Sequence, residues 1–321
     1  MEPTPRYVEL ARSGELKRRA DQASERLCAC TLCPRACGVD REAGEHGYCR
    51  TGAAPTVYSH MAHPGEEPPI SGARGSGTIF LSGCTLSCVY CQNARFSQGG
   101  EGAERTVEDL AGMMLDLEAI GCHNINVVTP THQTAAILAA LDAAASEGLS
   151  VPLVWNTSSY ETQSTLELLD GVVDVYLADI RYASDAMASR YSDAADYATV
   201  ARAALLEMKR QVGELRTDER GLATGGLIVR HLVLPGGSGG TPECLAFVAS
   251  ELGEATFVSL MSQYYPAHRA GEHPAIDGRL TAAEWETATA AHAEAGLTNG
   301  WVQAFMGQVS EIAGTNLEPD G

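Results

Sequence analysis

Residues 78–93 read TIFLSGCTLSCVYCQN, in which a short apolar run leads directly into three cysteines. Thr78–Leu81 predicts a buried strand, because short runs of β-branched and aromatic residues are typical of strands. Cys84, Cys88 and Cys91 follow it with the spacing C-x3-C-x2-C. Thiolates at this spacing can occupy three corners of one 4Fe–4S cubane and leave the fourth iron open to a small molecule. A zinc site or a ferredoxin-like cluster is the alternative, but zinc usually takes four ligands and no fourth cysteine or histidine lies close by.

The chain that follows this loop alternates apolar runs with amphipathic ones. Strands are predicted at 125–128, 151–155, 172–178, 227–234 and 256–261, with a closing strand at 301–304. Helices are predicted at 106–120, 134–146, 162–169, 184–214, 242–252 and 281–295. Apolar strands that alternate with helices are typical of a parallel sheet covered by helices. Six such units favour an open barrel over a flat sheet, and ligands then bind at the carboxyl ends of the strands.

The segment in front of the first strand has a different character. Residues 5–27 predict a helix, residues 28–52 are rich in cysteine and glycine, and the prolines and glycines of 53–77 predict an irregular loop. We therefore predict four parts, an N-terminal helix, a cysteine-rich metal-binding segment with its loop, a barrel and a tail, over residues 1–27, 28–77, 78–305 and 306–321.

Eight of the ten cysteines lie between Cys28 and Cys91, and four of them form a second group. Cys30, Cys33, Cys37 and Cys49 have the spacing C-x2-C-x3-C-x11-C, and Cys28 could replace one of them. The clustering indicates a metal that contributes folding energy rather than disulfides. Zinc and a fully ligated second 4Fe–4S cluster both fit four thiolates, and unligated reduced cysteines are the third reading.

Composition limits the partners and the location. Lysine and arginine number 22 against 41 aspartates and glutamates, a formal net charge of −19. Such a surface repels phosphate backbones, so we expect no nucleic-acid partner. No apolar run reaches the ~18 residues of a membrane helix, and the polar N-terminal residues do not resemble a signal peptide. We therefore expect no membrane partner and a cytoplasmic location.

The cysteine loop after a first strand resembles the radical S-adenosylmethionine (SAM) superfamily. More closely, the chain resembles homologues of pyruvate formate-lyase activating enzyme that carry an extra N-terminal cysteine region. The stretches that carry this resemblance include CTLCPRACGVDREAGEHGYC (30–49), NVVTPTH (126–132), LVWNTSSYE (153–161), LDGVVDVYLADIRY (169–182) and VRHLVLPG (229–236). The resemblance implies an α/β fold, a partial (β/α)6 barrel of radical SAM type over residues 78–305, behind the cysteine-rich segment.

The resemblance also implies contacts with SAM. Tyr90 matches an aromatic residue near the adenine, and His132 ends the second strand, where a ring nitrogen could reach the SAM amino group. Polar side chains end the third strand, namely Asn156, Thr157 and Ser158, although helix capping or a turn would also explain them. Asp179 ends the fourth strand and suits an ammonium or ribose hydroxyls. Arg230 suits the SAM carboxylate.

Three further features bear on the site. Side chains alternate along a strand, so only one of Arg230 and His231 can point inward, and we expect Arg230. Gly99-Gly100-Glu101 comes too soon after Cys91 to end the second strand, so we interpret it as a loop. Activating enzymes usually have Asp-x-Lys after the fourth strand, whereas this chain has Asp179-Ile180-Arg181, and arginine is a different donor. Glu66 and Glu67 either face the barrel mouth and bind a cationic group or lie in a solvated loop.

The expected reaction is reductive cleavage of SAM at a 4Fe–4S cluster and abstraction of a hydrogen atom from a substrate by the 5′-deoxyadenosyl radical. The expected electron donor is a one-electron reductant such as flavodoxin or ferredoxin. The substrate implied by the resemblance is a glycine in a partner glycyl radical enzyme. A peptide or small molecule modified directly is the alternative, and a non-catalytic iron–sulfur electron carrier is a more distant one.

Overall fold

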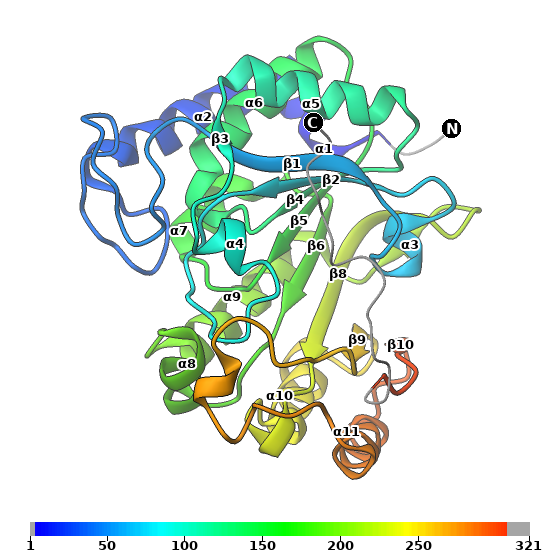
Figure 1. Ribbon diagram of the computed structural model, residues 1–321. Coiled ribbons are helices and arrows are strands. Elements are labelled where there is room, and N and C mark those ends of the chain that lie inside the picture. The colour runs from blue at the N-terminus through cyan, green and yellow to red at the C-terminus, as the bar shows by residue number, and fades with distance from the viewer. Residues whose placement is uncertain (1–3, 307–321) are drawn as a thin grey trace.

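A computed structural model describes residues 4–306 (Figure 1). Among these residues, ten strands form one mixed sheet that does not close on itself, in the order β10-β9-β8-β6-β5-β4-β2-β1-β3, with β7 paired to β8. The strands are β1 Thr56–His63, β2 Ser76–Leu81, β3 Ala103–Glu104, β4 Ile125–Val128, β5 Leu153–Thr157, β6 Val175–Asp179, β7 Arg216–Thr217, β8 Ala223–Leu232, β9 Phe257–Met261 and β10 Gly300–Val302. The predicted tail at 306–321 lies, apart from its first residue, outside the described residues.

The six main strands β2, β4, β5, β6, β8 and β9 are parallel and adjacent in chain order. The α-helices are α1 Arg6–Arg12, α2 Glu15–Glu25, α3 Pro68–Ser71, α4 Ala94–Ser97, α5 Val107–Ala119, α6 Thr134–Ser146, α7 Gln163–Leu169, α8 Asp185–Ser192, α9 Tyr197–Val212, α10 Thr241–Phe247 and α11 Ala282–Glu294. Successive main strands are thus joined by helical crossovers, which brings all their carboxyl ends to one side. No helix of the described residues is long and apolar enough to cross a membrane.

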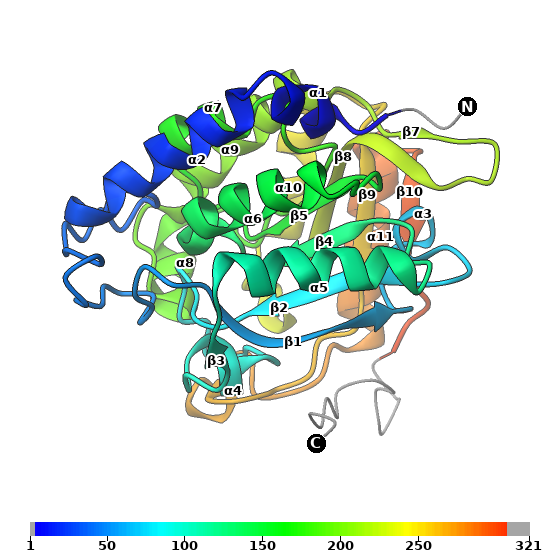
Figure 2. The ribbon, with the colours of Figure 1, turned by 90° about the horizontal axis from the view of Figure 1, so that it is seen from above.

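The helices cover the outer face of the sheet. In Figures 1 and 2, α5 and α6 lie along one side of the strands and α10 and α11 along another. Alternate side chains of each strand enter the core under these helices, among them Trp155, Tyr176 and Val229. The opposite face carries a smaller apolar cluster that includes Val154, Val175, Leu177 and Ile228. One step further along these strands, the same face carries polar side chains, which form the candidate site.

Three predicted elements differ from the structure. The N-terminal helix is interrupted at Gly14, whose φ of 77° lies in the left-handed region that glycine adopts readily. The helix predicted at 184–214 is two helices, because Asp193 adopts a φ of 53° and ends α8. The segment 53–77, predicted to be irregular, contains α3 and β1, and β1 pairs antiparallel with β2. Its half-exposed, polar sequence gave no apolar run to indicate a strand.

Candidate functional site

Three thiols lie on one wall of a cavity at the carboxyl ends of the main strands. Cys84, Cys88 and Cys91 line this cavity, whose volume is about 270 Å³. Strand-end residues line the other side: Thr129, Asn156, Thr157, Ser158, Asp179 and Arg230. The cavity therefore joins the cysteine loop to the edge of the sheet at which ligands of α/β proteins bind.

Each thiol has a polar neighbour. The backbone N–H of Leu86 donates to Cys84 Sγ at 3.3 Å, and Ser192 Oγ donates to Cys88 Sγ at 2.9 Å. Arg181 Nη1 lies 3.5 Å from Cys88 Sγ, and Ser97 Oγ lies 3.3 Å from Cys91 Sγ. Burial, followed by the neighbouring Cys88 thiol, raises the pKa of Cys84 to about 12. A thiol in such a place ionises at neutral pH only when a cation binds it, as metal ligation does.

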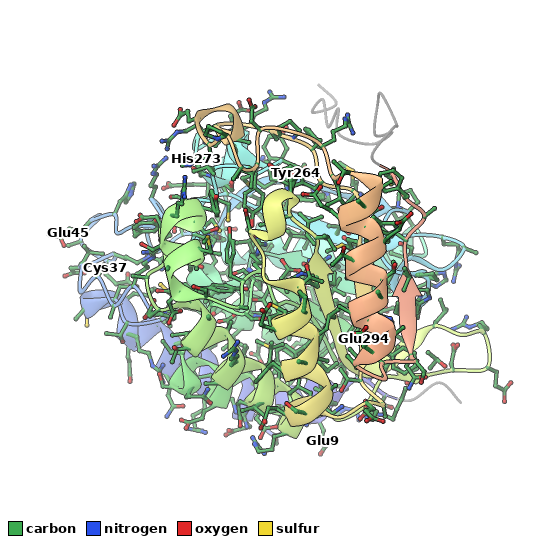
Figure 3. The ribbon with its side chains drawn as sticks, turned by 90° about the horizontal axis from the view of Figure 1, so that it is seen from below. Glu9, Cys37, Glu45, Tyr264, His273 and Glu294 are labelled. Carbon is green, nitrogen blue, oxygen red and sulfur yellow. The ribbon has the colours of Figure 1, made fainter. Side chains whose placement is uncertain are left out.

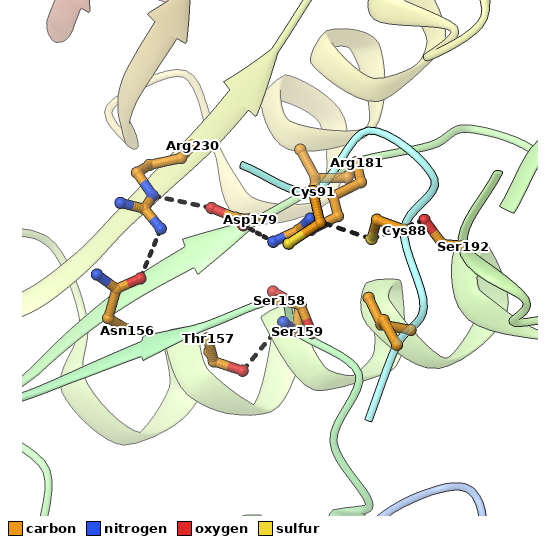
Figure 4. Close-up of polar contacts among 12 residues, drawn as sticks. Cys88, Cys91, Asn156, Thr157, Ser158, Ser159, Asp179, Arg181, Ser192 and Arg230 are labelled. Atoms are coloured by element: carbon orange, nitrogen blue, oxygen red, sulfur yellow. Dashed lines mark hydrogen bonds and ion pairs between the residues drawn. The ribbon is translucent and has the colours of Figure 1, made fainter. Parts of the chain in front are cut away.

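The opposite wall carries a network of charges centred on Arg230 (Figure 4). Its guanidinium donates to Asp179 Oδ1 at 2.8 Å and to Asn156 Oδ1 at 2.5 Å, and it lies 3.4 Å from Glu66 Oε2. Arg181 donates to the other oxygen of Asp179 at 2.6 Å. Two arginines and two carboxylates from three segments thus meet beside the thiols. Such a wall can bind a ligand that carries both a carboxylate and a cationic group.

Glu66 is an acid of this network whose pKa is raised. Burial raises its pKa from 4.5 to about 7, although Arg230 opposes the shift. Asn126 Nδ2 donates to Glu66 Oε1 at 3.2 Å. Of the two readings of this loop, the structure therefore favours the one in which Glu66 faces the site.

The other predicted residues divide between the cavity and its surroundings. Ser158 lines the cavity, and its buried hydroxyl has no hydrogen-bond partner within the part of the chain that the structure describes. Tyr90 lines an adjoining cavity of about 230 Å³, and its hydroxyl lies 2.7 Å from that of Tyr182. His132 does not line either cavity, and its Nε2 lies 2.7 Å from the carbonyl oxygen of Ser82. Gly99–Glu101 form a loop, where Glu101 pairs with Arg95 at 3.0 Å.

Arg230 points into the cavity, whereas its neighbour His231 points into the outer core. Nδ1 of His231 lies 2.6 Å from the carbonyl oxygen of Ile180, and Nε2 lies 2.9 Å from Thr241 Oγ1. Because a carbonyl can only accept, Nδ1 carries the proton and Nε2 accepts from the threonine. The alternation of strand side chains therefore places these two residues as predicted.

Sequence reasoning did not identify Ser97, Asn126 or Ser192 as site residues. Ser192 ends α8 and reaches Cys88 across 104 residues of sequence. A single serine at a helix end has no local pattern that separates it from an ordinary surface residue. Only the fold brings it to the thiol.

All ten cysteines are reduced. The second group meets the cysteine loop where the backbone of Cys49 packs against Gly83. Cys30, Cys33 and Cys49 are buried, whereas Cys37 and Cys28 are exposed. Over residues 4–306, no three His, Cys, Asp or Glu side chains are arranged to hold a metal ion.

Comparison with known proteins gives a clear relative. The uncharacterized protein MJ0674 of Methanocaldococcus jannaschii is 32% identical over 271 residues, which span 81% of this chain and 72% of the relative. This chain belongs to the MJ0674 family. The sequence matches no protein-family model. A crystal structure of HydG, a maturase of the [FeFe]-hydrogenase, aligns over 70% of this chain with a TM-score of 0.49 and 12% identity. The match spans half of the HydG chain.

The cysteine loop of this MJ0674-family protein fits an iron–sulfur cluster with an added small ligand. The loop carries three thiols and no histidine, aspartate or glutamate. An N–H donates to Cys84 Sγ, an O–H donates to Cys88 Sγ, and the hydroxyl of Ser97 is in hydrogen-bond contact with Cys91 Sγ. Buried polar atoms without partners, Ser158 Oγ and Arg181 Nε, belong to residues that line the same cavity. Unsatisfied buried polar groups are rare in native proteins, so their presence beside the thiols indicates that a polar ligand binds here.

Gly83 provides a test of how the cysteine loop is held in this MJ0674-family protein. Its φ is +80°, and a Cβ atom there would overlap the carbonyl oxygen of Cys49. Gly100 has a similar φ of +77° with open space around it. We expect Gly100→Ala to cost about 1 kcal/mol from backbone strain alone, and Gly83→Ala about 1–3 kcal/mol more, because the two segments must move apart. Urea unfolding of both variants measures this difference, and equal losses would contradict it.

His231 predicts a pH dependence of stability. Burial lowers its pKa from 6.5 to about 4, so the unfolded chain binds a proton below pH 6.5 that the folded protein does not. The part of the unfolding free energy that depends on neutral, buried His231 is complete above pH 6.5. It is lost as the pH falls towards 4, by up to about 1.4 kcal/mol per pH unit. We expect His231→Gln to destabilise the protein less at pH 5.5 than at pH 7.5. His46→Gln, at an exposed site, serves as the control. An equal loss at both pH values would refute the assignment.

Proposed function

We propose that this protein is a radical SAM enzyme. The observation that carries the proposal is the placement of Cys84, Cys88 and Cys91 on one wall of a cavity whose other wall holds the Arg230 network. A 4Fe–4S cluster with SAM bound supplies a 5′-deoxyadenosyl radical when it is reduced by one electron. A site in which three thiols face paired charges supports the binding of a small polar ligand at the cluster. A cluster used only for electron transfer would have four protein ligands and no such charged wall.

Each residue of the site would bind a different part of the cluster or of SAM. The three thiolates would hold the cluster and leave one iron for SAM. Arg230 would bind the SAM carboxylate, and Asp179 an ammonium or ribose hydroxyls. Asn156 and Ser158 offer further hydrogen bonds at the same strand ends, and Tyr90 lies beside the thiols for the adenine. A contact of His132 with SAM stays a sequence-based prediction, and its ring would have to leave the Ser82 carbonyl to make it.

For the substrate, we propose a glycine of a partner protein, on the resemblance to activating enzymes. The adjoining cavity supports a substrate position beside the thiols, because it shares Cys91, Asp179 and Arg181 with the first and adds Met261 and Tyr264. A peptide or small molecule modified directly is the second candidate for the same place. A flavodoxin or ferredoxin would supply the electron. A second iron–sulfur cluster or a zinc ion on the four N-terminal cysteines is a separate proposal, because the chemistry at Cys84 does not require it.

The test is anaerobic reconstitution with iron and sulfide, followed by SAM and dithionite, with 5′-deoxyadenosine measured by chromatography. We expect 5′-deoxyadenosine and methionine in equal amounts. An intact cluster that neither binds SAM nor forms product would leave the electron-carrier reading. For the substrate, a partner protein that acquires a glycyl radical signal in electron paramagnetic resonance would support the first candidate. Product stimulated by peptides or small molecules, with no partner radical, would support the second.

A further inference from the structure

Arg41 is a buried cation that has no carboxylate partner among residues 4–306. Only 3% of the surface of this residue is exposed to solvent. Nε donates to the carbonyl oxygen of Gly52 at 2.9 Å, Nη1 to that of His132 at 2.6 Å, and Nη2 to Thr51 Oγ1 at 3.2 Å. All of these acceptors are neutral, and within residues 4–306 no aspartate or glutamate forms an ion pair with this guanidinium. Burying a charge without a counter-charge is strongly unfavourable, so a negative group is expected beside it.

Among the contacts of Arg41, the group that can carry a negative charge is a cysteine. Nη1 of Arg41 also lies 3.9 Å from Cys30 Sγ. Cys33 is close enough to Cys30, Cys37 and Cys49 to interact electrostatically with each of them. Cys30, Cys33 and Cys49 are buried, and Cys37 lies at the edge of the molecule (Figure 3). A neutral thiol cannot balance a guanidinium, whereas four thiolates around zinc or around a 4Fe–4S cluster leave a net negative centre.

We propose that Cys30, Cys33, Cys37 and Cys49 bind a metal centre through four thiolates and that Arg41 provides its counter-charge. The proposal does not depend on radical chemistry at Cys84, since it concerns different cysteines and different contacts. Zinc and an iron–sulfur cluster both take four thiolates. Over residues 4–306 no three such side chains are arranged to hold a metal ion, so the four thiols must close on the centre when it binds, and metal analysis separates zinc from a cluster.

This centre would also support the loop that carries Cys84. Arg41 binds the carbonyl of His132, and Cys49 lies against Gly83, the residue before Cys84. Arg35, from the same cysteine-rich segment, donates through Nε to the carbonyl oxygen of Thr85 at 2.8 Å. The residues on both sides of Cys84 therefore contact the cysteine-rich segment, and a metal that orders the segment would order the loop.

The first experiment measures metal in a full-length variant that lacks the three loop ligands, Cys84→Ala/Cys88→Ala/Cys91→Ala. It is purified anaerobically and analysed for iron, zinc and sulfide, as isolated and after reconstitution with either metal. We expect one zinc per chain, or iron and sulfide in cluster proportion. Adding Cys33→Ala/Cys49→Ala should remove the metal, and adding Cys28→Ser should not. A triple variant that retains no metal under either condition would overturn the proposal, whatever the native protein does with SAM.

The second experiment tests Arg41 in the same background. Arg41→Met removes the charge, and Arg41→Lys retains it with fewer donors. We expect the metal to be lost to a chelator about ten times faster from Arg41→Met than from its parent, with Arg41→Lys in between. Circular dichroism shows whether each variant is folded, and only folded protein is compared. Equal loss rates for all three would show that Arg41 is not the counter-charge.

Discussion

Replacing Cys88 with alanine is expected to abolish 5′-deoxyadenosine formation, with a loss of at least about 100-fold. Cys88 is 5% exposed, and its sulfur is the one with two side-chain donors, Ser192 Oγ at 2.9 Å and Arg181 Nη1 at 3.5 Å. A cubane held by two thiolates loses the ligand set that leaves one defined iron open. The measurement is product yield together with iron and sulfide bound at the Cys84 loop.

Cys122→Ala is the matched control for this result. Cys122 is also buried, at 3% exposure, but it lies before β4 and lines neither cavity beside the loop. We expect this variant to retain iron and product formation and to lose only the stability of one buried group. If Cys88→Ala formed product at the native rate, the assignment of the cluster to this loop would be wrong.

Replacing Arg230 with methionine is expected to be the most destabilising change in the charge network. Asp179, at 2.8 Å, and Glu66, at 3.4 Å, would both lose their shared cation in a buried place. Removing one partner of a buried ion pair typically costs 3–5 kcal/mol. Since methionine has similar length and no charge, the loss measures electrostatics more than packing. The same variant should fail to bind SAM in equilibrium dialysis.

A second substitution separates the charge effect from a general structural defect. In Arg230→Met, Asp179 keeps its contact with Arg181, whereas Glu66 loses its guanidinium partner. Glu66→Gln removes that carboxylate, so Arg230→Met/Glu66→Gln should be more stable than Arg230→Met alone. Arg269→Met, which breaks the exposed pair with Glu272, should change stability little. If the double variant were no more stable than Arg230→Met, the carboxylate of Glu66 would not be the source of the loss.

The regular part of the fold follows closely from the sequence. β4 and α6 begin and end at the predicted residues, and the other main strands differ at their ends by a few residues. These elements are predictable because continuous apolar runs and helical periodicity are local properties. β1 was missed because a polar, half-exposed strand forms only when β2 supplies its hydrogen-bond partners.

The site was predictable where a motif or strand alternation determined it. Cys84, Cys88 and Cys91 follow from spacing, and the orientation of Arg230 follows from the pleat of β8. The contact of Glu66 with Arg230 joins residues 164 positions apart, and that of Ser192 with Cys88 joins residues 104 apart. No spacing rule predicts such pairs, because they depend on how the whole sheet curves.

The long reach from Ser192 and Arg181 to Cys88 also has a consequence for biosynthesis. When the first hundred residues have left the ribosome, eight of the ten cysteines are already present, but the donors to Cys88 have yet to be made. The N-terminal half emerges first, so its thiols are exposed before the second half can fold around the loop. Cluster delivery to the growing chain would therefore expose iron to the N-terminal cysteines and to the cysteine loop before folding has separated the two groups. Maturation of this protein should favour delivery after release, when α8 has closed over the cysteine loop.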